Sequence, residues 1–320
     1  MVVDLPTASD FDSACISSLN MAWQIAYDLL YQEELADIPT WDDDGTVTDD
    51  YWQSAQPILR NALGLIQQAH ELGLKGKLTA VSPYLLISQD ASRWPGGPGP
   101  VSFSSFRTVD AVDLPRAMEL FLSPLSTRFR DLYEGIRKKR NTFAHGVSKG
   151  ERLAAIDLLK IILTTLQELF AGQPWPKLRL TYLENDPTSI AYSSDHAYPR
   201  LLQEMVKVIN ELSPAEAKEF FGVDMKSRWY MCPGSCHSEI HADEFAATGD
   251  YPRLAQLRPA KTAGAEHLYC FVCGDTVAIE RTACKDPKCP ADVVFTDGFG
   301  ERVCLTCDKS QLDPSVGDVV

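Results

Sequence analysis

The chain has 320 residues, of which 45% are hydrophobic, so it is long enough for one medium-sized domain and a smaller one. Its formal net charge of −14 argues against general nucleic-acid binding, because neutralising phosphates requires concentrated lysine and arginine, and any RNA contact must be local. No apolar run approaches the roughly 20 residues that span a bilayer, and the first residues lack a secretion signal, so we expect a soluble, cytoplasmic protein without a membrane partner.

The first third of the chain has the spacing of long helices. Between about residues 9 and 36, apolar residues recur at intervals of three and four, which predicts a helix. A second helix is predicted from about Tyr51 to Leu72, with Gly73 as its C-terminal stop. Residues 78–108 lose this spacing, and their proline- and glycine-rich part predicts a loop with a short hairpin around it.

Helical spacing resumes near Asp113, which is predicted to cap a helix that is interrupted at Ser123–Pro124 and then continues to about Ala144. A further helix, from about residue 150 to residue 171, is so rich in leucine and isoleucine that we expect it at the centre of a helical bundle.

Beyond this helix the chain is predicted to become irregular up to about residue 197, because it contains several prolines and a Ser-Ser-Asp stretch. Two short helices are predicted to follow, at about 199–212 and 214–221. The chain is thus predicted to divide into a helical bundle, a linker with short helices and a cysteine-rich domain, over residues 1–172, 173–225 and 226–320.

The helix that ends near Ala144 carries the most informative stretch, in which Arg140 and Asn141 precede His145. An arginine five residues before a histidine occurs by chance in about one chain in three of this composition, so the spacing alone is weak. On a helical projection, however, Arg140 falls within the apolar stripe that contains Tyr133 and Ile136. An arginine directed at an apolar interior needs a partner, so we expect a specific role for it.

This stretch resembles the Arg-x4-His motif of HEPN-domain ribonucleases, in which the residue after the arginine is polar, often asparagine, and the motif lies on a helix of an α-helical bundle. The resemblance covers the motif and the helical character of about the first 170 residues. It implies that His145 acts as general acid or base on the ribose 2′-hydroxyl. It also implies that Arg140 holds the phosphate, that Asn141 orients the imidazole or contacts RNA, and that catalysis needs no metal.

The run Arg137, Lys138 and Lys139 is the densest basic segment and is predicted to bind RNA. Residues five apart on an ideal helix point about 140° away from each other, so Arg140 and His145 converge only if the helix breaks or two chains share one site. HEPN nucleases dimerise with both motifs at a common cleft, and we therefore expect a homodimer. Members of this family commonly serve as toxins or in antiviral defence.

The residues also allow a plainer interpretation. His145 can be a helix-terminal residue that interacts favourably with the helix dipole, and Arg140 can pair with a carboxylate of the core. The bundle would then be an inactive HEPN scaffold or another non-catalytic protein.

Eight of the nine cysteines lie in close pairs between residues 232 and 307. In a reducing compartment this arrangement is typical of metal binding rather than of disulfides, although redox cysteines remain an alternative. We predict two structural Zn²⁺ sites and no catalytic metal, with the first site formed by Cys232, Cys236, Cys270 and Cys273 and the second by Cys284, Cys289, Cys304 and Cys307. His237 or His241 can replace Cys236, and the quartets can interleave. Cys15 is predicted to be a small buried residue.

The overall prediction is a mainly α protein, in which a HEPN-like helical bundle is followed by a small cysteine-rich domain with short strands that resembles a pair of zinc ribbons. The predicted function is metal-independent cleavage of RNA, with the zinc domain recruiting the substrate or a protein partner. The alternative is a non-catalytic protein that binds a protein or nucleic acid. A zinc hydrolase would need an open coordination position, which complete cysteine quartets do not leave.

Overall fold

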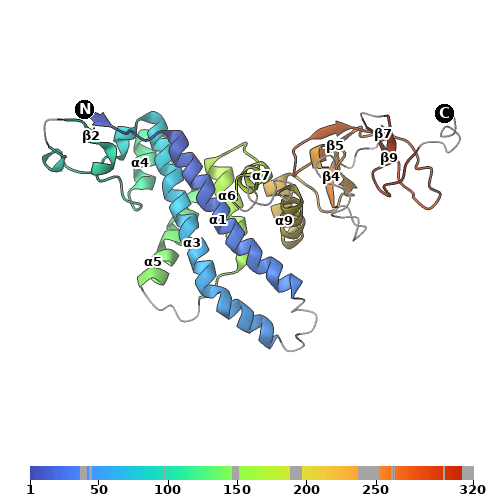
Figure 1. Ribbon diagram of the computed structural model, residues 1–320, viewed down its shortest axis with the longest axis horizontal. Coiled ribbons are helices and arrows are strands. Elements are labelled where there is room, and N and C mark those ends of the chain that lie inside the picture. The colour runs from blue at the N-terminus through green and yellow to red at the C-terminus, as the bar shows by residue number, and fades with distance from the viewer. Residues whose placement is uncertain are drawn as a thin grey trace. The chain divides into compact units, whose positions relative to one another are not determined.

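The computed structural model of the chain is mainly helical, with a C-terminal region of short strands (Figure 1). The chain divides into two compact units, Met1–Gln173 and Pro174–Val320. Within the described ranges, every helix is too short or too polar to cross a bilayer. The structure describes the following residues, without the side chains of Ala144 and His145: 1–36, 42, 45–96, 99–145, 151–187, 197–236, 252–260, 262, 264–297 and 300–311.

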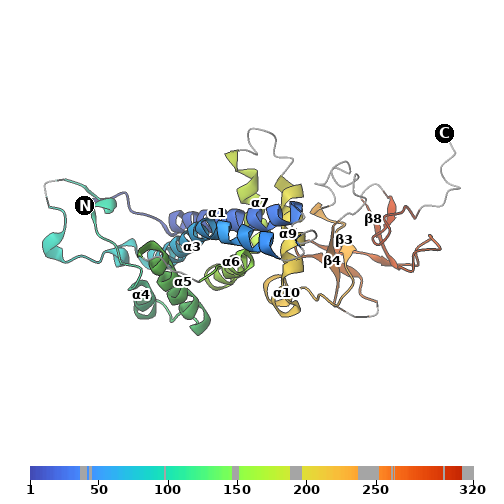
Figure 2. The same ribbon diagram turned by 90° about the horizontal axis from the view of Figure 1, so that it is seen from below.

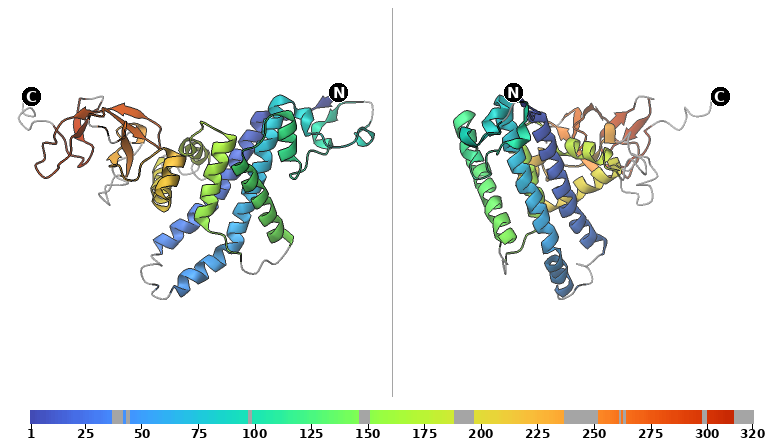
Figure 3. Two further views of the ribbon diagram at one scale, coloured as in Figure 1. Left: turned by 180° about the vertical axis from the view of Figure 1, so that it is seen from behind. Right: turned by 60° about the vertical axis from the view of Figure 1, so that its left-hand side comes forward.

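The N-terminal unit is built on two long helices, α1 (Ala8–Leu35) and α3 (Thr46–Val81), which lie side by side (Figure 1 and Figure 2). Figure 3 shows α3 between α1 and α5 (Thr127–His145). The leucine-rich helix α6 (Ala155–Leu169) contacts all three, which confirms its predicted central place. A short helix, α4 (Leu114–Phe121), packs against α3.

Helix α1 follows the predicted spacing closely. It starts with a capping box, in which the Thr7 hydroxyl accepts a hydrogen bond from the Asp10 N–H and the Asp10 carboxylate accepts one from the Thr7 N–H. Its apolar stripe, which includes Leu19 and Trp23, is fully buried. Cys15 is also fully buried, and burial raises the pKa of its thiol to about 12. Cys15 is therefore an inert core residue, as predicted.

The predicted helix stop at Gly73 is wrong, because α3 continues to Val81. Gly73 lies where α3 closely approaches its neighbours α1 and α6. A Cβ atom there would lie 2.6 Å from Leu169 Cδ1 and 3.3 Å from Cys15 Sγ. The glycine thus lets three helices approach one another, and their packing outweighs its poor helix propensity.

This role of Gly73 can be tested against Gly64, a glycine of the same helix where an added Cβ would meet no atom within 4 Å. Alanine at Gly64 should stabilise the protein by about 1 kcal/mol through helix propensity. Alanine at Gly73 gains the same amount but overpacks the core, which costs about 1–3 kcal/mol. We expect the two variants to differ by this packing cost in urea unfolding followed by circular dichroism. Equal stability of the two variants would contradict the packing role.

In the described part of the segment between α3 and α4, the hairpin predicted around the loop is reduced to one antiparallel bridge. Its strand β2 (Val101–Ser102) pairs in parallel with β1 (Val2–Val3) at the start of the chain. A single antiparallel bridge between Ile87 and Thr108 closes the loop. Three short 3₁₀ turns complete the segment, at Pro83–Leu86, Ala91–Arg93 and Phe103–Ser105. Asp113 precedes α4 as predicted, but its side chain makes no capping hydrogen bond.

His70, in the C-terminal half of α3, is fully buried in the core of this unit. Its Nε2 lies 2.7 Å from the hydroxyl of Thr165, which itself donates to the Ile161 carbonyl. The hydroxyl is therefore the acceptor and His70 Nε2 carries the proton. The rings of Phe129 and Tyr133 contact the imidazole, with centroids 5.1 and 5.9 Å away. Burial lowers the pKa of His70 to about 3.

This depressed pKa predicts acid sensitivity of the N-terminal unit. The unfolded His70 binds a proton below its ordinary pKa of about 6.5, whereas the folded one stays neutral until about pH 3. The free energy of unfolding should therefore fall by about 2 kcal/mol from about pH 7 to about pH 5. His70→Gln keeps a donor for Thr165 but cannot titrate, so it should show a shallower pH dependence in urea unfolding. Identical slopes for the two proteins would contradict the assignment.

Among the described residues, the C-terminal unit begins with helices α7 (Trp175–Glu184), α9 (Ala197–Glu211) and α10 (Pro214–Phe221). The last two confirm the predicted short helices. The prediction of an irregular segment before them is wrong for Trp175–Glu184, which forms α7. Its prolines are compatible with a helix, because Pro174 is the N-cap and Pro176 lies in the first turn.

Helices α7 and α9 are joined by a fully buried ion pair. The Arg179 guanidinium donates two hydrogen bonds of 2.8 Å to the Glu204 carboxylate. Two charges without solvent contact persist only when each satisfies the other in this way. The stretch predicted as a linker therefore contains two helices that a buried ion pair joins to each other.

The described strands that follow α10 form two antiparallel sheets. A four-stranded sheet has the order β3-β4-β5-β6, and a three-stranded sheet has the order β7-β8-β9. Most strands are only two to four residues long, so neither sheet buries much apolar surface by itself. The strands are β3 (Tyr230–Met231), β4 (Arg253–Arg258), β5 (His267–Cys270), β6 (Thr276–Ala278), β7 (Glu280–Arg281), β8 (Val293–Thr296) and β9 (Arg302–Cys304).

Candidate functional sites

The cysteines of the C-terminal unit gather into two groups of four. In each group, the sulfur atoms all lie within 4.8 Å of one another. The groups have the composition that the sequence spacing predicts: Cys232, Cys236, Cys270 and Cys273 in the first, and Cys284, Cys289, Cys304 and Cys307 in the second. The alternative ligands His237 and His241 lie outside the described residues.

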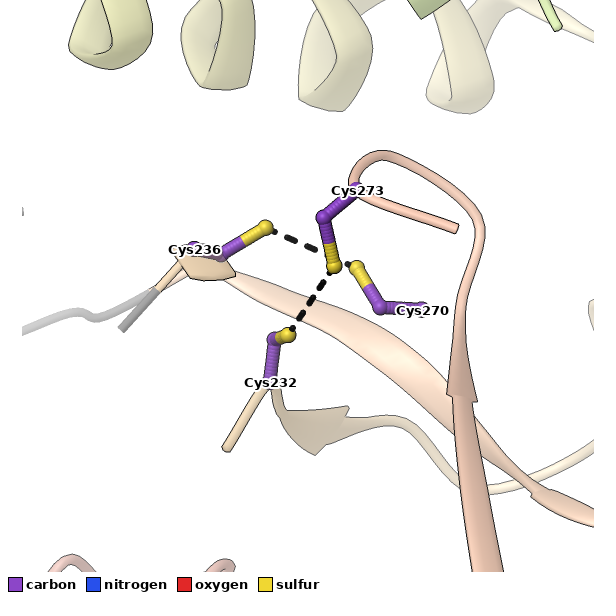
Figure 4. A group of neighbouring side chains, drawn as sticks. All are labelled: Cys232, Cys236, Cys270 and Cys273. Carbon is purple, nitrogen blue, oxygen red and sulfur yellow. Dashed lines mark hydrogen bonds between the residues drawn. The ribbon is translucent and has the colours of Figure 1, made fainter. Parts of the chain in front are cut away.

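The first quartet is assembled by two turns at the ends of strands β3 and β5. Figure 4 shows the four sulfur atoms pointing toward one another. Sγ of Cys232 lies 3.6 Å from that of Cys273, and Sγ of Cys236 lies 3.6 Å from that of Cys270. The Gly234 N–H donates a hydrogen bond to Cys232 Sγ over 3.3 Å.

The second quartet lies beside the three-stranded sheet, with Cys304 at the end of β9 and the other three cysteines in turns and loops. It is less buried than the first, since only Cys304 of its four cysteines is buried. An N–H group again donates to a sulfur, here from Asp286 to Cys284 Sγ over 3.4 Å. The turn after Cys304 matches the one after Cys270. Asp308 has φ +57° where Gly274 has φ +78°, and the N–H of each donates over 2.9 Å to the carbonyl of the first cysteine of its turn.

The charge of these groups points to a cation. Four thiolates so close together repel one another, so they ionise fully only around a positive ion. Hydrogen bonding with Cys232 raises the pKa of Cys236 and Cys270, and it lowers the pKa of Cys273. Both quartets can therefore hold a metal ion, and a compact set of four soft sulfur ligands suits zinc.

Two further residues support the first quartet, and the cysteine pattern gives no sign of either. The Asp275 carboxylate accepts hydrogen bonds from the Ser235 N–H and hydroxyl, over 2.8 and 2.7 Å. A Cβ on Gly234 would lie 2.5 Å from the same carboxylate, so only glycine permits this contact. The Tyr198 hydroxyl of α9 lies 3.8 Å from Cys236 Sγ. These contacts orient the two cysteines of the first turn.

We predict that Asp275→Ala weakens metal binding at the first quartet by about 10–100-fold, the usual cost of losing a residue that orients metal ligands. Competition with a chromophoric chelator would measure the metal affinity. One of the two bound metal ions should be released to the chelator more readily than in the wild type. Glu301→Gln, an exposed carboxylate between β8 and β9, is the control with unchanged affinity. Equal chelator curves for Asp275→Ala and wild type would refute the orienting role.

The helix that carries the predicted catalytic motif places Arg140 differently from the sequence projection. Arg140 is exposed, and it does not face an apolar interior. Its Nη1 donates to Asn141 Oδ1 over 3.3 Å. Within the described part of the chain, it pairs with no carboxylate. The part of α3 beside Arg140 is not a continuous apolar surface, because it carries polar side chains such as Asn61 and Glu71 as well as Leu65.

The other predicted RNA-contacting residues are in part already engaged. Arg137 pairs with Glu134 at 2.7 Å, and Lys139 pairs with Glu151 at 2.9 Å, whereas Lys138 is exposed. His145 is the last residue of α5, and its side chain lies outside the described part of the chain.

A concavity of about 790 Å³ lies between α3 and α5, beside the motif. Its lining includes Arg60, Asn61, Gln68, Glu71, Arg140 and Phe143. The Arg60 guanidinium lies over the Phe143 ring, with Cζ 4.8 Å from the centroid. The sequence alone did not single out the residues that α3 contributes to this lining. They lie along one side of the helix, and this spacing indicates a site only when the helix opposite is known.

Comparison of the chain with protein-family models, with curated proteins and with solved structures gave no match.

Proposed function

We propose that the protein is a metal-independent endoribonuclease of the HEPN type, with Arg140, Asn141 and His145 of α5 as its catalytic residues. The observation that carries the proposal is the exposure of Arg140 at a concavity that also contains Arg60. Its guanidinium makes no ion pair among the described residues, so its donors remain available for a phosphate.

The reaction follows from these groups. His145 takes the proton of a ribose 2′-hydroxyl, and O2′ attacks the adjacent phosphorus. The P–O5′ bond breaks and the leaving oxygen gains a proton, which gives a 2′,3′-cyclic phosphate and a 5′-hydroxyl. Arg140 stabilises the charge that develops on the phosphate oxygens. Because one imidazole serves best as either base or acid in a single step, we propose that two chains pair and supply one His145 each.

The two cysteine quartets complete the proposal as structural Zn²⁺ sites. Each offers four sulfur ligands, which closes the coordination of zinc and leaves no position for a substrate or an attacking water. The C-terminal unit then serves to recruit RNA or a protein partner. By the family resemblance, the enzyme is a cytoplasmic toxin or antiviral defence effector.

The test is incubation of the purified, zinc-loaded protein with single-stranded RNA in a buffer that contains EDTA, with zinc content checked afterwards. We expect cleavage products that end in a 2′,3′-cyclic phosphate, and no cleavage of DNA of the same sequence, because DNA lacks the attacking hydroxyl. Intact RNA in the presence of folded, zinc-loaded protein would refute the proposal.

The second candidate is a non-catalytic protein that binds a protein or nucleic acid. It is favoured by the ion pairs of Arg137 and Lys139, which occupy two of the three cations next to the motif. This candidate predicts RNA or partner binding without any cleavage product.

A further inference from the structure

We infer that the concavity between α3 and α5 binds a guanine nucleotide, so that the enzyme prefers RNA with guanosine at the cleavage site. The inference rests on the proposed function, since it names the base that this same site receives. It is carried by Glu71, Gln67, Arg60 and Arg140, which all line the concavity.

The size and charge of the concavity suit one nucleotide. Its volume of about 790 Å³ lies within the range of roughly 300–1,000 Å³ that small-molecule sites occupy. The charged residues among its lining are two arginines and one glutamate. The excess is therefore positive, in a chain whose formal net charge is −14, and a phosphate is the natural counter-charge.

Glu71 provides the base selectivity. The Gln67 amide donates to Glu71 Oε1 over 2.6 Å, which holds the carboxylate in one orientation while leaving Oε2 and further lone pairs as acceptors. An ionised carboxylate can accept two parallel hydrogen bonds. Among the four RNA bases, only guanine presents two adjacent donors, N1–H and N2–H, on its Watson–Crick edge. Adenine, cytosine and uracil each place an acceptor beside their donor and would leave the carboxylate partly unpaired.

Arg60 provides a second set of donors. The contact with the Phe143 ring holds the guanidinium in place. Arg60 lines the concavity, so the terminal nitrogens of its guanidinium can donate to a guanine O6 or to a phosphate oxygen. The planar guanidinium also offers a surface on which a base stacks. Arg140, on the same concavity, then holds the phosphate that is cleaved.

The experiment is equilibrium binding of guanosine, adenosine, cytidine and uridine 3′-monophosphates to the full, zinc-loaded chain by calorimetry. We expect the guanosine compound to bind about tenfold or more tightly than the other three. Glu71→Gln should abolish this preference, because the amide replaces one acceptor by a donor. The control is Glu134→Gln, which removes a carboxylate of α5 that pairs with Arg137 and does not line the concavity, and it should keep the preference.

Arg60→Lys is a second variant, which keeps the charge but loses the planar donor group, and it should weaken guanosine monophosphate binding while the helical signal is unchanged. Equal binding of the four nucleotides, or a guanine preference that survives in Glu71→Gln, would overturn the inference. Because binding is measured without catalysis, guanine selectivity in a protein that cleaves no RNA would support the nucleotide site and refute the nuclease. Cleavage of RNA without any base preference would support the nuclease and refute the guanine site.

Discussion

His145→Ala and Arg140→Ala are expected to remove nearly all RNA cleavage. Loss of a general acid or base costs about 10²–10⁴-fold in rate, and loss of a donor that stabilises developing negative charge costs about 10²–10³-fold. Arg140→Lys should recover only part of the rate, because an ammonium cannot form the planar, two-point contact of a guanidinium with phosphate. The measurement is the single-turnover cleavage rate of a labelled single-stranded RNA.

The matched control for this experiment is Arg116→Ala, which removes an exposed arginine of α4 outside the concavity. It should cleave at the wild-type rate. Circular dichroism and size-exclusion chromatography would establish that each variant keeps its helices and its oligomeric state. If cleavage persists in both the His145 and the Arg140 variant, the catalytic site lies elsewhere in the chain. If only the arginine variant is inactive, Arg140 binds RNA but His145 is no catalyst.

Replacement of one cysteine in either quartet is expected to unfold the sheet next to that quartet, which is the four-stranded sheet for the first and the three-stranded sheet for the second. The apparent binding free energy of a structural zinc site is about 10–16 kcal/mol, far more than strands of two to six residues gain by their own packing. In Cys270→Ser and Cys304→Ser, metal content should fall from near two zinc ions per chain to near one. Metal analysis and hydrogen exchange would measure the two effects. Protection should be lost in β4–β6 in Cys270→Ser and in β7–β9 in Cys304→Ser, and it should be kept in α1 in both variants.

Cys15→Ala is the matched control for the cysteine substitutions. It removes the ninth cysteine, which is buried in α1 and far along the chain from either quartet. It should leave the metal content unchanged while it lowers the stability of the helical bundle. Wild-type protein that carries less than one zinc ion per chain, or unchanged zinc content in both serine variants, would contradict structural metal sites.

Short-range spacing predicted much of the fold correctly. The interval of three and four apolar residues located α1, and the signals at the helix ends located α9 and α10. The close pairs of cysteines predicted the two groups that the structure brings together. These features could be predicted because a helical stripe and a metal-binding turn each depend on residues that are a few positions apart.

The errors have a different origin. Gly73 was expected to end a helix, yet it lies inside one, because the cost of glycine is offset by contacts with Leu169 and Cys15. Arg140 was expected to face an apolar interior, yet it is exposed, because a projection of α5 says nothing about the helix opposite. Arg60 and Glu71 carry no motif, and they became candidates only when α3 and α5 were seen to enclose a concavity.

The amino-acid sequence by itself determined where most helices lie and which cysteines form each group of four, since both follow from local geometry. Only the tertiary structure decided that α3 runs through Gly73, that Arg140 is open to a ligand, and that Glu71 lies in the same concavity. The physical reason is that burial and pocket shape depend on which surfaces meet, and those surfaces come from segments far apart in the chain.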